Sequence, residues 1–236
     1  MTGMTARRTL VLALVTVGTL APLVLFGARY PRWWAWIAPE ETPMTWLQSV
    51  VLVLAAAASA LVAFVLRSVG ERSAHRRAWW LLAAGFAALA VDERFALHER
   101  LRDRVLVPRG TTIPFLPWVA PGDFLVMAVA VVGLAVLPMV WRASSADAGA
   151  RRALLLGVGL AVVAVGLDSI DPSTWTVQAE RVQQTLEEVI ELASGLAFLA
   201  VAGLRLLGLL EQHLRPVPPA PLEQAVADRP RIPAPV

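Results

Sequence analysis

The stretch TWLQSVVLVLAAAASALVAFVL, residues 45–66, contains no charged side chain and decides the fold class of this chain. A helix of about 20 apolar residues is long enough to cross the hydrocarbon core of a bilayer, which is about 30 Å thick. Further apolar runs predict five more helices: residues 9–26, 78 onward (apolar to 91), 122–140, 153 onward (apolar to 167) and 177–210 (fully apolar only after Glu191). We therefore expect an all-α, polytopic membrane bundle of six transmembrane helices.

The composition agrees with this class and excludes several chemistries. Hydrophobic residues make up 57% of the 236 residues and charged residues only 17%, whereas soluble domains carry about 25% charged residues. Cysteine is absent, which excludes disulfides, thiol redox chemistry and thiolate metal sites. Lysine is absent too, which excludes a retinal Schiff base and a catalytic lysine. Residues 1–214 form the expected bundle, and the proline-rich residues 215–236 are expected to be a disordered tail.

The distribution of arginine predicts the orientation of the helices. With the N-terminus inside, the cytoplasmic segments hold 12 arginines and 5 acidic residues, whereas the outer segments hold 8 arginines and 13 acidic residues. Arginine is enriched on the cytoplasmic side of membrane proteins. We therefore expect a multi-pass protein of the bacterial inner membrane with both termini in the cytoplasm. Because the arginines lie in short loops between spans, the expected partner is the lipid bilayer and not nucleic acid.

Three of the predicted helices become polar on the outer side, before they have crossed the membrane. Six side chains there are candidates for a functional layer: Asp92, His98, Glu99, Asp168, Glu188 and Glu191. An acidic side chain in hydrocarbon costs roughly 2.5–3.5 kcal/mol, so we expect these groups to face the bundle interior around a pocket open to the outside. Gln48, near the outer end of its helix, is a further candidate for this layer.

The segment that follows residue 91 contains no helix-breaking residue before Pro108, which predicts a continuous helix. On such a helix Asp92 and Glu99 are about 10.5 Å apart along the axis and cannot bind one ion together. The remaining charges of this segment are interpreted as exposed ion pairs on an emerging helix, namely Glu93 with Arg100, Arg94 with His98, and Glu99 with Arg102, beside Asp103.

Three functions are compatible with the layer. The simplest is a membrane subunit or sensor, in which the acids form a structural salt-bridge network. The outer loops, residues 29–43 and 106–121, would then contact a membrane or periplasmic protein partner. The second is a metal-dependent membrane enzyme of the hydrolase type. The third is a proton- or cation-coupled transporter whose acids bind the coupled ion.

The enzyme hypothesis requires a divalent metal ion as cofactor. Its ligands would come from five side chains of the layer: Asp92, His98, Glu99, Glu188 and Glu191. Carboxylates with one imidazole suit Mn, Mg, Ca, Fe or Zn, and the excess of oxygen favours the harder ions. A water molecule activated by the metal would then serve hydrolysis at the membrane surface.

Overall fold

The computed structural model describes residues 3–115, 119, 124–170 and 174–213, and within these ranges the chain is helical without a strand. Its long helices are α1 (Gly3–Ala28), α2 (Pro43–Ser68), α3 (Ser73–Phe95), α5 (Phe124–Ala143), α6 (Ala148–Asp168) and α7 (Val177–His213). Short elements are the 3₁₀ helix η1 (Trp33–Trp36), α4 (Leu97–Leu101), the π-helical turn η2 (Arg102–Leu106) and the 3₁₀ turn η3 (Val107–Arg109). The prediction for residues 215–236 falls outside the described part.

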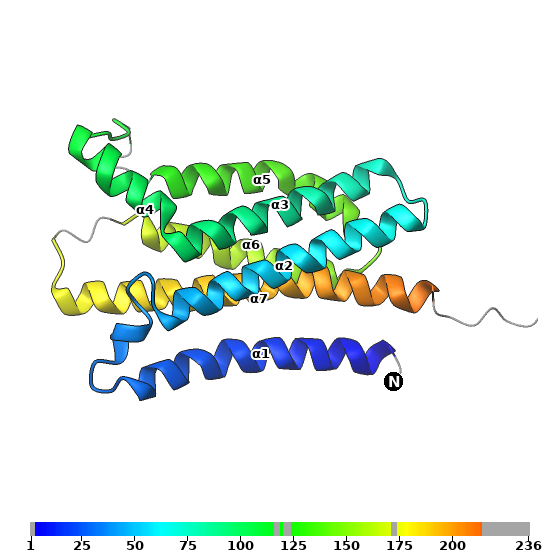
Figure 1. Cartoon of the computed structure of the whole chain (residues 1–236), viewed down its shortest axis with the longest axis horizontal. Coiled ribbons are helices and arrows are strands. Elements are labelled where there is room, and N and C mark those ends of the chain that lie inside the picture. Colours follow the sequence, from blue (N-terminus) through cyan, green and yellow to red (C-terminus); the bar gives the residue numbers. More distant parts are fainter. Residues whose placement is uncertain (1–2, 116–118, 120–123, 171–173, 214–236) are drawn as a thin grey trace, which may run out of the picture.

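Each of the six long helices corresponds to one that the sequence predicts, with most ends differing by a few residues. Five of them, all except α3, are long and apolar enough to cross a membrane. Helix α3 differs because it carries arginine in its first turns and Asp92, Glu93 and Arg94 in its last turn. All six run roughly along the long axis of the molecule, as expected for a bundle in a bilayer (Figure 1).

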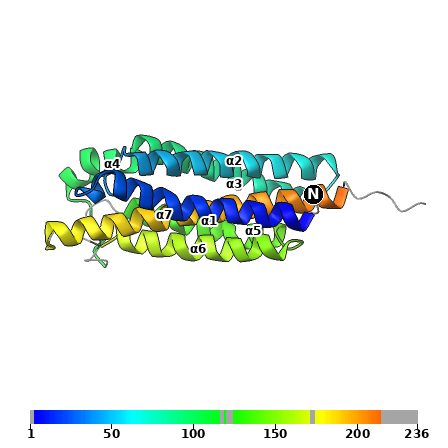
Figure 2. The same cartoon turned by 90° about the horizontal axis from the view of Figure 1, so that it is seen from below.

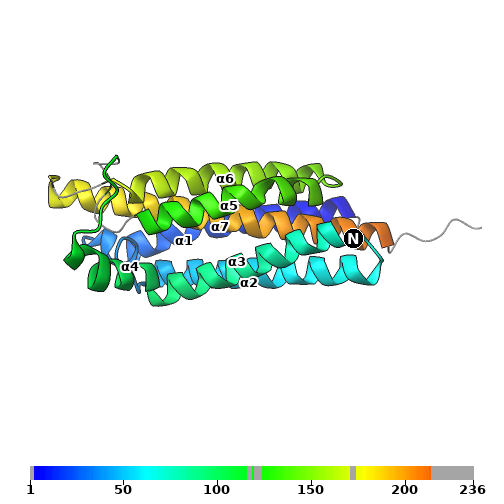
Figure 3. The ribbon, with the colours of Figure 1, turned by 90° about the horizontal axis from the view of Figure 1, so that it is seen from above.

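Helix α7 is the central element of the bundle. It spans 37 residues and contributes the largest set of buried side chains. Helices α2 and α3 pack together on one side of it, and α5 and α6 lie on the other side (Figure 3). Helix α1 lies along α7, as Figure 2 shows from below. Gly203 allows this approach, because a Cβ atom there would lie 2.7 Å from the Leu10 side chain.

The two ends of the bundle differ in charge. We call residues 29–42, 92–115, 168–170 and 174–191 the acidic end, and residues 3–8, 67–77, 141–152 and 205–213 the basic end. At the basic end Asp147 caps α6 through the backbone N–H of Ala150 and lies 2.8 Å from the Arg7 guanidinium. Arg7 also donates to Glu211 of α7 at 3.0 Å, so one arginine joins α1, α6 and α7.

The prediction that α3 continues to Pro108 is wrong. Ala96 adopts the left-handed conformation, with φ 45° and ψ 49°, and separates α3 from α4. The break is stabilised by Asp92, whose carboxylate accepts the backbone N–H of His98 at 2.8 Å. A side-chain acceptor thus offsets the roughly 1–2 kcal/mol cost of a left-handed alanine.

The break also redirects the charged side chains that follow it. His98 pairs with Asp92 instead of Arg94, and Arg100 donates to Glu41 at 2.7 Å instead of pairing with Glu93. The predicted pair of Glu99 and Arg102 does form, at 3.2 Å. Glu93 is thereby left to face the interior of the acidic end.

Candidate metal centre

A cavity of about 440 Å³ opens at the acidic end of the bundle. Its walls come from the loop before α2, from the end of α3 and the start of α4, and from the facing ends of α6 and α7. Eight carboxylates line it: Glu40, Glu93, Glu99, Asp168, Glu180, Glu187, Glu188 and Glu191. The cationic side chain Arg102 and the imidazole of His98 also line it, so acids outnumber bases by a wide margin.

Three of these carboxylates converge within the cavity. One oxygen each from Glu93, Glu188 and Glu191 lies within 4.8 Å of the other two. Glu188 and Glu191 are three residues apart on α7 and therefore share a helix face, while Glu93 reaches them from α3. Unit negative charges about 5 Å apart repel by about 3 kcal/mol at an effective dielectric constant of about 20. Positive charge, from a cation or from bound protons, is needed to offset this repulsion.

Glu188 is the least solvent-exposed of the three. It is 7% exposed, and its backbone carbonyl accepts a 3.0 Å hydrogen bond from the buried Gln48 amide of α2. Its Oε2 atom has no hydrogen-bond partner among the described residues, although the side chain lines the cavity. A buried carboxylate oxygen without a donor is rare in proteins, and a bound cation would satisfy it.

His98 is held at the edge of the cavity by Asp92. Its Nδ1 atom lies 2.7 Å from Asp92 Oδ2, and its backbone N–H donates to the other carboxylate oxygen. Burial alone would lower the pKa of His98, but the hydrogen bond and the negative charge of Asp92 raise it above its ordinary value. With Nδ1 on Asp92, the imidazole has its Nε2 atom left for another group.

The loop between α1 and α2 covers the other side of the cavity. Ile37 is buried in this loop, and the Trp34 ring lies 4.0 Å from the Arg181 guanidinium of α7, which fixes the loop to that helix. Glu40 follows and lines the cavity. Burial, and next the negative charge of Glu99, raise the pKa of Glu40 to about 7.

The buried side-chain amide of Gln183 joins α6 and α7 at the cavity wall that these two helices form. Gln183 of α7 donates to the Leu167 carbonyl at the end of α6 at 2.9 Å, and to the Glu187 carboxylate at 3.0 Å. This contact sets Asp168, the last residue of α6, at the cavity wall.

The structure brings most of the predicted layer together. His98, Glu99, Asp168, Glu188 and Glu191 line one cavity, and Asp92 stands behind His98. Of the five predicted metal ligands, Glu188 and Glu191 belong to the three-carboxylate cluster, whereas Asp92, His98 and Glu99 do not. Gln48 reaches the layer through its bond to the Glu188 carbonyl. Asp171, which directly precedes Pro172 and is predicted to end its helix, lies outside the described part.

Four cavity carboxylates lie outside the predicted layer: Glu40, Glu93, Glu180 and Glu187. The sequence pattern predicts a surface pair of Glu93 with Arg100, because a straight helix places the two on one face. Glu40 lies in a loop without periodicity, so no pattern pointed to it. For Glu93 a signal did exist, since it directly follows Asp92 at the same depth.

The comparisons with known proteins identify the family and nothing further. None of the curated proteins and none of the solved structures matches this chain. Residues 4–206 match a family described as a domain of unknown function, DUF8692. The match covers most of the chain, including every residue of the cavity and the three converging carboxylates. The chain therefore belongs to the DUF8692 family of domains of unknown function.

Proposed function

We propose that this protein is a multi-pass membrane protein that binds one divalent cation between Glu93, Glu188 and Glu191. The observation that carries the proposal is the approach of three carboxylate oxygens from two helices to within 4.8 Å of one another. Oxygen atoms that bind one Ca²⁺ or Mn²⁺ at about 2.2–2.6 Å lie at most about 5 Å apart, so small side-chain movements suffice. Oxygen-only ligands favour a hard ion, Mg²⁺, Mn²⁺ or Ca²⁺.

The charge balance supports cation binding over a structural salt-bridge network. Glu93, Glu188 and Glu191 have no ion pair with an arginine in the described part of the chain. Arg102, the cation on the cavity wall, lies against Glu99 and Asp103 instead. The unpartnered Glu188 Oε2 atom agrees, because a salt-bridge network leaves no buried acceptor unused.

The orientation follows from the arginines of the basic end. If this end faces the cytoplasm of a bacterium, as the enrichment of arginine favours, the protein lies in the inner membrane with its termini inside. The acidic cavity then opens to the outside, where divalent cations reach it without crossing the bilayer.

The test is cation binding by the full chain purified in detergent and stripped with EDTA. We expect one Mn²⁺ ion per chain, counted by electron paramagnetic resonance and displaced by Ca²⁺ or Mg²⁺. Glu188→Gln should raise the Kd for Mn²⁺ at least about tenfold, which corresponds to a loss of about 1.4 kcal/mol of binding free energy. Glu180→Gln is the matched control, because Glu180 lines the cavity but stands outside the three-carboxylate cluster. Equal binding by wild type and Glu188→Gln would overturn the proposal.

A metal-dependent hydrolase is the second candidate, and His98 is the observation that favours it. Three carboxylates leave coordination positions for water, and a histidine oriented by Asp92 lines the same cavity. Hydrolysis of p-nitrophenyl phosphate or p-nitrophenyl acetate by the Mn²⁺-loaded protein, lost in His98→Asn with Mn²⁺ still bound, would support this candidate. Turnover unchanged in that variant would exclude it.

A further inference from the structure

A second cavity, of about 470 Å³, lies on another face of α3, in a groove between α2 and α3. Apart from Ser49 and Arg94, its lining side chains are aliphatic or aromatic. Several of them are about half exposed on the surface of the bundle, among them Trp46, Val53 and Leu54 of α2 and Val91 and Phe95 of α3. We call this feature the α2–α3 groove.

The α2–α3 groove has the length of one bilayer leaflet. On α2 its lining extends from Trp46 to Ala56, a separation of ten positions or about 15 Å along the helix. The hydrocarbon core of a bilayer is about 30 Å thick, so the groove covers the half nearer the acidic end. Trp46 lies at the outer limit of this half, the depth at which tryptophan is enriched in membrane proteins.

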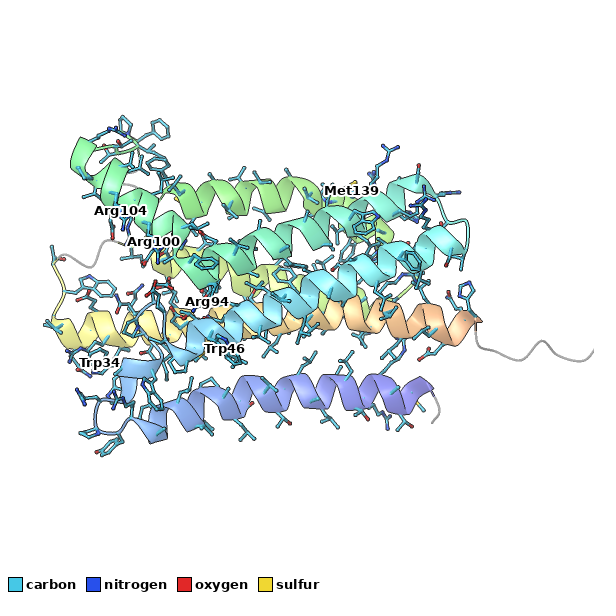
Figure 4. All side chains as sticks on the ribbon, in the orientation of Figure 1. Trp34, Trp46, Arg94, Arg100, Arg104 and Met139 are labelled. Carbon is cyan, nitrogen blue, oxygen red and sulfur yellow. The ribbon has the colours of Figure 1, made fainter. Side chains whose placement is uncertain are left out.

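Arg94 supplies a positive charge at the same end of the groove. Figure 4 labels Arg94 and Trp46 close together, where α3 ends and α2 begins. Arg94 is exposed, and its guanidinium lies 5.8 Å from the centre of the Phe95 ring. Among the described residues no carboxylate is within ion-pair distance of it, although acids are abundant at this end. The guanidinium fork is suited to binding a phosphate with two hydrogen bonds.

We propose that the α2–α3 groove binds one phospholipid of the leaflet at the acidic end, with an acyl chain between α2 and α3 and its phosphate on Arg94. The two parts of the ligand match the two parts of the site. The α2–α3 groove, which is apolar and as long as one leaflet, binds the acyl chain. The Arg94 guanidinium, at headgroup depth, binds the phosphate. This site is separate from the carboxylate cluster, and the proposal does not depend on cation binding there.

The experiment is native mass spectrometry of the full chain in detergent, titrated with dioleoyl phosphatidylglycerol and separately with dioleoylglycerol, which lacks the phosphate. We expect one tightly bound phosphatidylglycerol per chain. Arg94→Gln should weaken its binding about tenfold, the loss expected from one charge-assisted contact, and should leave dioleoylglycerol binding unchanged. Arg104→Gln, which changes another exposed arginine of the acidic end outside the groove, should bind as wild type.

A second pair of variants tests the apolar part. Ala87→Phe fills the groove from an exposed lining position and should weaken both lipids, while Ala88→Phe, at an exposed position outside the lining, should not. Phosphatidylglycerol binding that survives both Arg94→Gln and Ala87→Phe would overturn the proposal. So would a disulfide-linked dimer of Val53→Cys in native membranes, since it would show that a second copy of the chain covers the groove. The chain has no cysteine of its own to confuse this readout.

Discussion

Asp92 binds His98 twice, through the backbone N–H at 2.8 Å and the ring Nδ1 atom at 2.7 Å. The two residues flank the left-handed Ala96, so this contact both closes the break after α3 and orients the imidazole at the cavity. One carboxylate therefore has a structural and an orienting role.

Replacement of Asp92 should destabilise the acidic end. Asp92→Ala removes both acceptors of His98 and leaves the left-handed turn unsupported, which should lower the free energy of unfolding by about 1–3 kcal/mol. Thermal unfolding in detergent, followed by circular dichroism, measures this loss. Asp103→Ala is the control, because the Asp103 carboxylate is 63% exposed. Equal melting temperatures for the two variants would show that Asp92 does not hold the break.

The Glu40 carboxylate should make stability depend on pH. Its pKa in the folded protein is about 7, above the ordinary 4.5, so between these values the unfolded chain loses a proton that the folded chain retains. Stability is then lost as the pH rises from about 4.5 to 7, by up to about 3 kcal/mol. Glu40→Gln should melt at a higher temperature than wild type at pH 8 and at a similar temperature at pH 4.

The matched control for this pH dependence is Glu41→Gln. Glu41 is the adjacent residue, it is exposed, and it pairs with Arg100 outside the cavity. Melting curves in EDTA exclude a contribution from bound metal. If Glu41→Gln and Glu40→Gln change the pH profile equally, burial of Glu40 is not the cause.

The choice of cation ligands can be tested by comparing Glu93 with Glu99. The structure places an oxygen of Glu93 in the three-carboxylate cluster, whereas the sequence pattern favoured Glu99. Glu93→Gln should weaken Mn²⁺ binding at least about tenfold, and Glu99→Gln should weaken it much less, through the loss of distant charge alone. Isothermal titration of both variants decides between the two ligand sets, and the reverse order would favour the set predicted from sequence.

Asp147 should be important for stability at the basic end. Asp147→Ala removes the cap of α6 and the buried partner of Arg7, and should lower the free energy of unfolding by about 2–4 kcal/mol. Cation binding at the far end should be unchanged in the same variant. Chemical unfolding in a mixed-micelle system measures the loss, and Glu211→Ala, which removes the more exposed partner of Arg7, should cost less.

Hydrophobicity alone was sufficient to predict the helices. Burial of backbone polar groups in hydrocarbon forces long, unbroken helices, so a 20-residue apolar run has few alternative structures. In a bilayer a charged side chain in hydrocarbon is costly as well, which would account for the acidic side chains of α3, α6 and α7 lining one cavity.

The break at Ala96 could not be predicted in this way. Alanine favours helix, and neither glycine nor proline marks the position. The break depends on Asp92, four positions before Ala96, whose carboxylate accepts the backbone N–H of His98 beyond the turn. A helical wheel assumes a continuous helix and therefore cannot predict such a contact. Once the helix is broken, Arg100 reaches Glu41, and Glu93 is freed to join Glu188 and Glu191. The predicted ligand set and the three-carboxylate cluster therefore differ because the helix was expected to be continuous.

Glu93 and Arg94 are consecutive residues of α3, and one lines the acidic cavity while the other lines the α2–α3 groove. Neighbours on a helix project about 100° apart, and the backbone between them is rigid. Any twist of α3 about its own axis therefore displaces both side chains in the same sense. If Glu93 binds a cation and Arg94 binds a phospholipid, the two binding equilibria are thermodynamically linked. The factor by which the cation changes the affinity for the lipid then equals the factor by which the lipid changes the affinity for the cation.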